Sequence, residues 1–483
     1  MRLPSRACLF SVIAWLIVWP NVAPAAGKVL LRVAAGPLPP AEAIGVSEVV
    51  LSWPVRDAAS LAKLRAIGFR VFLEAGSDDL TAAAIAAERA NLAGVIVNLA
   101  GAEAAANNET FRSIKAAHPK LLFRFLISSG KQPQMRGRLV VNRNGILRVS
   151  SPSSQPWLDT NLAAVRLAET FHPDETAVLY DFHWDLSDAV HKELGPNAGE
   201  YALAISEAAA IRADVIVDVP ESLQKALVAK QPAAWALWNQ VKQYVAFSSA
   251  FGADGMRPIA NMGIVACDAQ TNYEAINLLA RHNLPFETVR LQDLNEERSN
   301  GWNALVVFCT PGNPEISFFN DFANRGGVVV MVNQRGDYPW HSTAPARQDE
   351  HSTTFSVGSG VIDELGEPVT DPEVFARDVR RLIGTERSAL SLWNSLTTLV
   401  TGYRQESSGE TILHVINYAD VPDNVQVQIK GRFASVQLET LEAGCCVTLQ
   451  SFERGGFTEF TIPRLVVAAR VHLKSADIGP ATR

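Results

Sequence analysis

The feature that most constrains this chain is an alternation of short apolar β-rich runs with Ala- and Leu-rich helical runs, which continues from Val29 to Phe247. Eight of the runs have the length and the β-branched composition of strands, and they span residues 29–33, 49–53, 70–75, 94–99, 121–126, 147–151, 177–182 and 215–219. Eight β/α repeats over roughly 220 residues predict a TIM-like (β/α) barrel.

One irregularity interrupts the alternation after the fifth run. The segment RLVVNRNGILRVSS places Asn144-Gly145 between two β-rich runs, and this dipeptide is a hairpin signal. We therefore expect a barrel that is decorated, or incomplete, between its fifth and seventh strands.

Two further units follow the barrel, and the whole chain is predicted to be a multidomain α/β protein. Strands and helices alternate again, with helices expected at 273–282, 315–324 and 372–383, as in a doubly wound sheet of flavodoxin type. Beyond Leu390, seven short alternating runs without helices predict an antiparallel β-sandwich. The expected boundaries are 26–252 for the barrel, 257–385 for the flavodoxin-like unit and 390–474 for the sandwich.

The N-terminal segment is typical of a signal peptide. Arg2 and Arg6 precede the apolar run Cys8–Trp19, and Ala23-Pro24-Ala25 fits the cleavage rule, so residues 1–25 are predicted to be removed. We expect an exported protein, periplasmic or extracellular, and no membrane span after signal removal, because no later run reaches about 18 apolar residues. The net charge of −7 without a basic cluster argues against nucleic acid as a partner.

The remaining cysteines carry no recognisable metal or redox motif. Cys267 and Cys309 lie in or just after runs that are expected to be buried strands, and Cys445 and Cys446 are adjacent. This distribution favours buried free thiols over a redox role or a nucleophile. Because GxGxxG, P-loop and His/Cys ligand spacings are absent from the sequence, we expect no cofactor and no metal.

Three acidic residues lie at the ends of predicted barrel strands. These are Glu74, Asp181 and Asp218, and strand ends of this kind meet at the carboxyl-terminal face, where barrel active sites lie. Glycoside hydrolysis needs two carboxyl groups, so the three are candidate catalytic residues. The alternative for each is a helix N-cap or a buried acid bonded to backbone amides, and capping of the helix that starts near Glu221 would explain Asp218 well.

Polar and aromatic residues in the same loops are candidates for substrate binding. Aromatic faces stack on sugar rings, while acids and histidine bind sugar hydroxyls, as a sugar cleft requires. The candidates are Trp53, Asp159, His183, Trp184, Asp185 and Glu221. The alternative is that the aromatic residues cap the barrel core.

Three segments in the second half resemble the bacterial β-galactosidases that carry a trimerisation domain. They are ANMGIVACDAQTNYEAINLLARHNLPFETVRLQDL, FFNDFANRGGVVVMV and TILHVINYAD. The order of parts, barrel, flavodoxin-like domain and terminal sandwich, is also similar. The resemblance implies glycoside hydrolysis, a carbohydrate ligand and a homotrimer.

The sequence departs from that family at its catalytic residues. The family has an Asn-Glu pair after the fourth barrel strand, but here Asn98 is followed by Leu99, and Asn108-Glu109 falls within a predicted helix. Two hypotheses follow. The chain is an exported glycoside-hydrolase-like protein that acts on oligosaccharide or polysaccharide through a carboxylate pair, or it is a catalytically inactive barrel that serves in carbohydrate binding or assembly.

Overall fold

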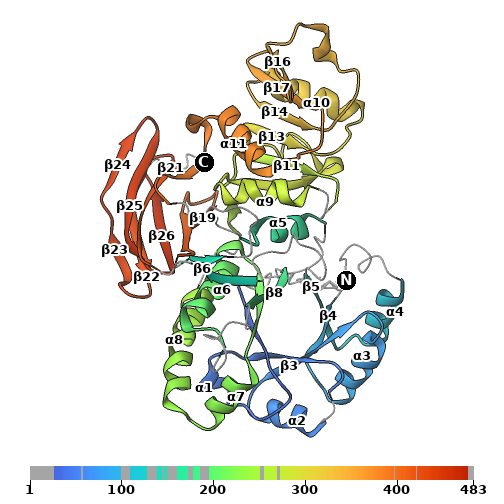
Figure 1. Ribbon diagram of the computed structural model, residues 1–483, viewed down its shortest axis with the longest axis vertical. Helices are drawn as coiled ribbons and strands as arrows, with labels where there is room; N and C mark the ends of the chain where they lie inside the picture. The colour runs from blue at the N-terminus through green and yellow to red at the C-terminus, as the bar shows by residue number, and fades with distance from the viewer. Residues whose placement is uncertain are drawn as a thin grey trace, which may run out of the picture.

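The computed structural model shows three units, with the barrel at the bottom of the view, the middle unit at the top and the sandwich beside them (Figure 1). The residues that it describes are 27–55, 58–98, 109–127, 139–143, 146–148, 160–171, 178–184, 195–250, 255–268, 272–395, 397–419 and 421–476. The predicted signal peptide, residues 1–25, lies outside the described residues.

The first unit is a closed barrel of seven parallel strands. The strands are β1 (Val29–Arg32), β2 (Glu48–Ser52), β3 (Arg70–Gly76), β4 (Gly94–Asn98), β5 (Leu122–Ile127), β8 (Leu179–Trp184) and β9 (Asp214–Asp218). Neighbours along the chain pair in order from β1 to β5, and β9 pairs with both β8 and β1. The barrel closes where Leu126 of β5 lies opposite Leu179 of β8.

The predicted barrel strand at 147–151 is wrong, whereas the expected irregularity at this point is confirmed. Strands β6 (Leu139–Arg143) and β7 (Ile146–Arg148) pair antiparallel, and β6 continues along the end of β8. A parallel barrel neighbour needs a crossover of a dozen or more residues, and the short connection from β6 to β7 allows only a hairpin. The hairpin therefore extends the sheet beyond the barrel wall, and seven strands close the ring.

Helices cover the outside of the barrel. They are α1 (Ala41–Ile44), α2 (Ala58–Ala66), α3 (Leu80–Arg89), α4 (Glu109–Ala117), α5 (Leu162–Phe171), α6 (Ala198–Ile211), α7 (Glu221–Val228) and α8 (Pro232–Ser249). Helix α6 begins with a capping box between Asn197 and Glu200, and it is buried from Glu200 to Ile211. It packs against α8, β9 and the sandwich strand β20 (Thr411–Asn417), so it needs apolar residues on every side.

The barrel interior is layered, because side chains two positions apart on a strand face the same way. Its middle layer takes one buried apolar residue from each strand: Leu30, Val50, Phe72, Ile96, Leu126, Leu179 and Ile216. At the amino-terminal end lie two ion pairs, Arg70 with Glu48 at 2.5 Å and Arg124 with Asp214 at 2.8 Å. The layer at the carboxyl-terminal end is also charged, and it forms the candidate site.

The middle unit is a seven-stranded sheet in the order β12-β11-β13-β14-β17-β16-β15, in which the first five strands are parallel. The strands are β11 (Met262–Ala266), β12 (Phe286–Arg290), β13 (Ala304–Val307), β14 (Val328–Val332), β15 (Arg347–Gln348), β16 (Ser352–Val357) and β17 (Gly360–Leu365), and the helices are α9 (Tyr273–Arg281), α10 (Asn313–Asn324) and α11 (Pro372–Ile383). One apolar core lies under α9 and α11, and another lies under α10. Barrel helix α5 packs on α9 and β12.

The terminal unit consists of two antiparallel sheets, as the alternating runs predict. One is β10-β19-β20-β26-β22-β23 and the other is β18-β21-β25-β24, with a shared apolar core. The further strands are β10 (Arg257–Pro258), β18 (Leu390–Leu392), β19 (Thr398–Arg404), β21 (Asp423–Lys430), β22 (Phe433–Thr440), β23 (Gly444–Thr448), β24 (Ser451–Arg454), β25 (Phe457–Leu465) and β26 (Ala468–Ser475). One of the seven alternating runs, CVTLQSF (residues 446–452), is divided between β23 and β24, which belong to different sheets.

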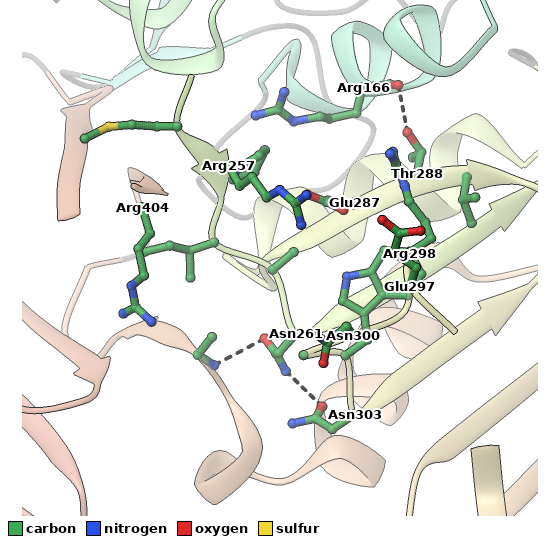
Figure 2. A pocket seen from close by; sticks show the side chains of 18 of the residues that line it. Arg166, Arg257, Asn261, Glu287, Thr288, Glu297, Arg298, Asn300, Asn303 and Arg404 are labelled. Atoms are coloured by element: carbon green, nitrogen blue, oxygen red, sulfur yellow. Dashed lines mark hydrogen bonds between the residues drawn. The ribbon is translucent and has the colours of Figure 1, made fainter. Parts of the chain in front are cut away.

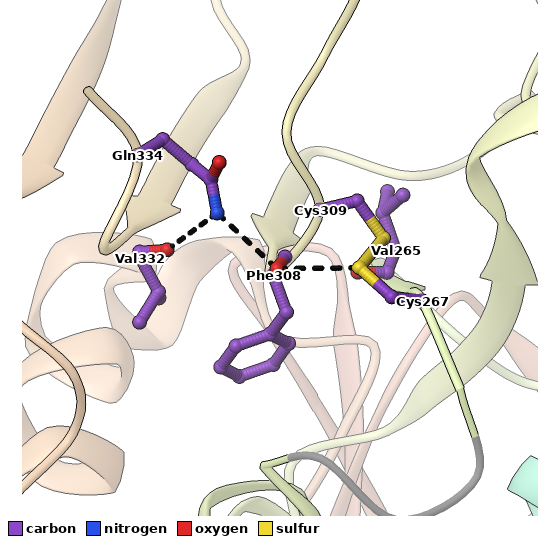
Figure 3. The surroundings of a disulfide bond; sticks show 6 residues. All are labelled: Val265, Cys267, Phe308, Cys309, Val332 and Gln334. Carbon is purple, nitrogen blue, oxygen red and sulfur yellow. Dashed lines mark hydrogen bonds between the residues drawn. A yellow bond between two sulfur atoms is a disulfide. The ribbon is translucent and has the colours of Figure 1, made fainter.

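The expectation of free thiols is wrong for Cys267 and Cys309, which form a disulfide across the ends of β11 and β13 (Figure 3). Parallel neighbours in a sheet bring the two Cα atoms to 5.4 Å, which sequence spacing alone does not reveal. Cys445 and Cys446 are also paired. Among the helices of the described ranges, none is both long enough and apolar enough to cross a membrane.

Candidate functional site

Arg32 at the end of β1 lies among the three acids that the sequence predicts as catalytic. Its Nε is 2.8 Å from Oε2 of Glu74, its Nη1 is 2.7 Å from Oδ1 of Asp218, and its Nη2 is 3.3 Å from Oδ2 of Asp181. The acids come from β3, β8 and β9, and they lie two positions beyond the apolar layer. The fold therefore brings all three candidate acids together around one guanidinium.

Asn98 completes this group, which we call the Arg32 cluster (Arg32, Glu74, Asn98, Asp181 and Asp218). The Nδ2 of Asn98 donates to Oε1 of Glu74 at 3.0 Å, so both oxygens of Glu74 accept a hydrogen bond. Exposure differs among the acids, since the Asp181 side chain is 4% exposed, that of Glu74 10% and that of Asp218 26%. Asp218 is thus the acid most open to a ligand.

The charges of the cluster stabilise one another. Burial by itself would lower the pKa of Arg32, but the carboxylates of Glu74, Asp218 and Asp181 raise it well above the ordinary value. A buried arginine among acids stays fully protonated, so the cluster combines one cation with three acidic side chains. Such a cluster can accept hydrogen bonds from sugar hydroxyls and can stabilise positive charge in a ligand.

Helix capping does not explain Asp218. The N-cap of α7 is Pro220, without a side-chain cap, and the Asp218 carboxylate is bonded to Arg32 instead. The Asp218 carbonyl accepts a hydrogen bond from the Tyr201 hydroxyl at 2.8 Å, which fixes the end of β9 to helix α6. The carboxylate is therefore held on the inner side of the barrel.

Trp53 and Glu221 do not join the cluster. Trp53 is partly buried and packs against the core between the strands and the helices, on the outer side of the barrel wall. Glu221 is the first residue of α7, its side chain is 64% exposed, and it pairs with Lys225 at 2.7 Å. Trp53 therefore serves in packing, and Glu221 lies on the surface of a helix.

The other predicted binding residues belong to the end of β8 and to the sequence after it and before α5. His183 and Trp184 form the end of β8, where they pair with Leu139 and Val140 of β6, but their side chains lie outside the description. Asp159 and Asp185 lie outside the described residues.

Sequence reasoning missed Arg32 as a site residue and Asn98 as its neighbour. A signal for Arg32 was present, because a charged residue two positions after the buried Leu30 must share the interior face of the strand. Buried charges are normally paired, so an interior arginine implies acids on nearby strands. In the described parts of the chain, no group of three or more His, Cys, Asp or Glu residues is arranged to hold a metal ion.

Comparison with known proteins gives matches in structure but not in sequence. No family model and no curated protein matches this chain. The chain is similar to α-L-fucosidase isoenzyme 2 from Paenibacillus thiaminolyticus, with 11% identity and a TM-score of 0.58 over 94% of this chain and 100% of that one. It also matches the GH42 β-galactosidase Gan42B of G. stearothermophilus, with 10% identity and a TM-score of 0.49 over 90% of this chain and 94% of that one.

A third match is the exo-β-1,4-mannosidase Op5Man5 from the Opitutaceae bacterium strain TAV5. Its identity is 12% and its TM-score 0.42, over 74% of this chain and 96% of that one. Bacterial β-galactosidases, which the sequence resembles, are thus among the solved structures that this chain matches. The match to the fucosidase spans nearly all of both chains, so the fold of this chain, a parallel barrel followed by smaller units, is one that a glycoside hydrolase also uses.

Proposed function

We propose that this chain is an exported carbohydrate-binding protein built on a glycoside hydrolase fold, and that the Arg32 cluster contacts the sugar. The observation that carries this proposal is that Arg32 pairs with all three candidate acids, at 2.7–3.3 Å. The cluster lies at the carboxyl-terminal end of the strands, where barrel proteins place their ligand sites. Ionised carboxylates and a guanidinium offer acceptors and donors to sugar hydroxyls.

The same observation favours binding over cleavage. A glycosidase needs one carboxyl group that is protonated and donates its proton to the leaving oxygen. A guanidinium within hydrogen-bond distance favours the ionised form of each acid it touches. Both oxygens of Glu74 already accept hydrogen bonds, from Arg32 and from Asn98, so Glu74 suits the role of acceptor rather than that of proton donor.

Glycoside hydrolysis is the second candidate, and one feature supports it. Asp181 is the most buried of the three acids and has the longest contact with Arg32, 3.3 Å. Of the three acids it is therefore the one held most loosely by the guanidinium, which suits a group that donates a proton to the leaving oxygen. Glu74, whose oxygens accept hydrogen bonds from Arg32 and Asn98, would then act as nucleophile or stabiliser on the same face.

A screen of the mature protein against a glycan array and a panel of aryl glycosides separates the two candidates. Saturable sugar binding without turnover supports the binding protein. Turnover that falls about 10²-fold or more in Asp181→Asn supports the hydrolase. A protein that neither binds nor cleaves any sugar in the panel contradicts both.

We further propose export, a flavodoxin-type middle unit and a homotrimer assembled through that unit. The Cys267–Cys309 disulfide supports export, since disulfides persist mainly in oxidising compartments. The parallel order β12-β11-β13-β14-β17, which is 2-1-3-4-5 in chain order, supports a flavodoxin-type sheet. Mass spectrometry of the exported chain should show an N-terminus near Ala26, and a monomer in light scattering at micromolar concentration contradicts the trimer.

A further inference from the structure

We propose that the cavity at the junction of the three units is a binding site for an acidic saccharide, one whose carboxylates are spaced by hydroxyl-bearing carbons. The cavity has a volume of about 1090 Å³, and its walls come from helix α5, from strand β12 with the segment 293–303, and from the sandwich (Figure 2). This volume is slightly larger than the roughly 300–1,000 Å³ that small-molecule sites occupy, so the cavity has room for an oligosaccharide. We call it the junction cavity.

The junction cavity has an excess of positive charge. Among the described residues that line it, eight are basic and five are acidic. Three of the basic residues are neutralised locally, since Arg166 pairs with Glu169, Arg257 with Glu406 and Arg290 with Asp293. The excess positive charge of the cavity therefore comes from its other basic residues.

Five cations of the junction cavity have no carboxylate within 4.0 Å in the described parts of the chain. They are Arg212, which donates to the Met256 carbonyl, and Arg298, Arg387, Arg404 and Lys430. Figure 2 shows Arg404 on one side of the cavity and Arg298 with Glu297 on the other. Cations that face a shared space from two sides suit a ligand with more than one negative group.

Arg404 is the clearest of these cations. Its Nε donates to Thr411 Oγ1 at 3.2 Å, its Nη2 lies 3.5 Å from the Lys430 carbonyl, and its guanidinium lies over the Phe433 ring at 6.0 Å. These contacts fix the orientation of the Arg404 guanidinium without neutralising its charge. The surrounding protein lowers the pKa of Arg404 by removing water from the guanidinium, a cost that a bound carboxylate would offset.

Acidic side chains in the same cavity narrow the class of ligand. Glu287 and Glu297 line it without an ion pair in the described residues, and burial raises the pKa of Glu287 although Arg298, Arg166 and Arg257 lower it. Their oxygens can accept hydrogen bonds from hydroxyl groups, and they would repel a dense polyanion. A uronic acid saccharide offers carboxylates and hydroxyls together, whereas a nucleic acid or a heavily sulfated chain does not match this pattern.

This site is separate from the Arg32 cluster. None of the five residues of that cluster is among the described residues that line the junction cavity. The inference rests on the charges of the cavity and not on the proposed function of the barrel, so either can fail alone.

The test is calorimetric titration of the full mature chain with a tetragalacturonate and with a neutral tetrasaccharide of equal length. We expect saturable binding of the acidic sugar, at least tenfold tighter than of the neutral one, and weaker at high salt. The double variant Arg298→Gln/Arg404→Gln should weaken this binding at least tenfold. The matched control is Arg335→Gln/Arg454→Gln, which removes two exposed arginines outside the cavity and should leave binding unchanged.

Four results overturn the proposal. They are equal affinity for the neutral sugar, equal loss in the control variant, retained affinity in the cavity variant, and inorganic phosphate that competes at the same concentration as the saccharide. The single variant Arg404→Gln, which alters only one side chain of the cavity wall, keeps the test valid if the double variant melts at a lower temperature.

Discussion

Tyr418 of the C-terminal sandwich donates its hydroxyl hydrogen bond to the buried carboxyl group of Glu207 in barrel helix α6. Asn161 and Tyr180 donate to the same carboxyl group, at 2.6 and 3.0 Å. Glu207 thus receives hydrogen bonds from the residue that immediately precedes α5, from β8 and from the sandwich. It fixes the barrel to the terminal unit through a single fully buried side chain.

Glu207→Ala should destabilise the whole chain, because it leaves three buried donors without their acceptor. We expect a loss of roughly 2–4 kcal/mol in the free energy of unfolding, measured by urea denaturation at neutral pH. The exposed Glu350→Gln serves as control and should change stability by less than about 0.5 kcal/mol. An alanine variant as stable as this control would mean that the carboxyl does not hold the units together.

Glu207→Gln should instead alter the pH dependence of stability. Burial raises the pKa of Glu207 above its ordinary value of 4.5, despite the hydrogen bonds from Tyr418, Asn161 and Tyr180. A raised carboxyl pKa contributes stability that is complete below the unfolded value and is lost as pH rises towards the folded value. The glutamine variant lacks this loss, so its stability relative to the wild type should increase from pH 4.5 to 7.5. A constant difference across that range would contradict the expectation.

Arg32→Gln should be strongly destabilising at neutral pH. The substitution leaves Glu74, Asp181 and Asp218 facing one another without a cation, and breaking a buried ion pair costs roughly 3–5 kcal/mol. Protonation relieves that repulsion, so part of the loss should be recovered near pH 4. Thermal melts of this variant and of Arg335→Gln at both pH values check the result, and equal melting temperatures for the two variants would contradict it.

Asp218→Asn and Asp181→Asn should behave differently, because their side chains are 26% and 4% exposed. If the Arg32 cluster binds sugar, the exposed Asp218 meets the ligand, and its variant should bind about tenfold more weakly with a nearly unchanged melting temperature. Asp181→Asn should lower the melting temperature and leave affinity per folded molecule nearly unchanged. The reverse pattern, with activity lost in Asp181→Asn alone, would favour the hydrolase.

Cys309→Ala should cost stability by opening a covalent loop between residues 42 positions apart. Removing such a cross-link increases the conformational entropy of the unfolded chain, and the expected loss in the free energy of unfolding is about 2–4 kcal/mol. Urea denaturation should give the same midpoint for this variant as for the wild type under reducing conditions. Alkylation of Cys267 in the unreduced, unfolded wild type would show instead that the two thiols are free.

The local elements of this protein follow from its sequence to a large extent. The alternation of apolar runs and helical runs predicts the barrel strands, and Pro372–Ile383 is both the expected and the observed extent of α11. Asp371 caps that helix through the backbone nitrogens of Glu373 and Val374, which is a contact between near neighbours. Hydrophobic periodicity, helix capping and turn-forming residues each depend on only a few neighbouring residues, so they can be recognised directly in the sequence.

Placing the acids at strand ends was also possible from sequence, since a strand that ends in an acid presents it at the barrel face. The pairing of these acids with Arg32 could not be predicted from sequence, because Arg32 and Asp218, for example, are 186 residues apart. Their meeting depends on β1 and β9 being neighbours, which closure after seven strands decides. The disulfide between Cys267 and Cys309 likewise depends on β11 lying beside β13.

The sequence by itself determined most of the strands and helices, because these follow from local periodicity. Only the tertiary structure decided that Arg32 pairs with the three candidate acids, and that unpaired arginines from the middle unit and the sandwich meet in one cavity. Charge interactions act through space over a few ångströms, and packing of whole units sets those distances.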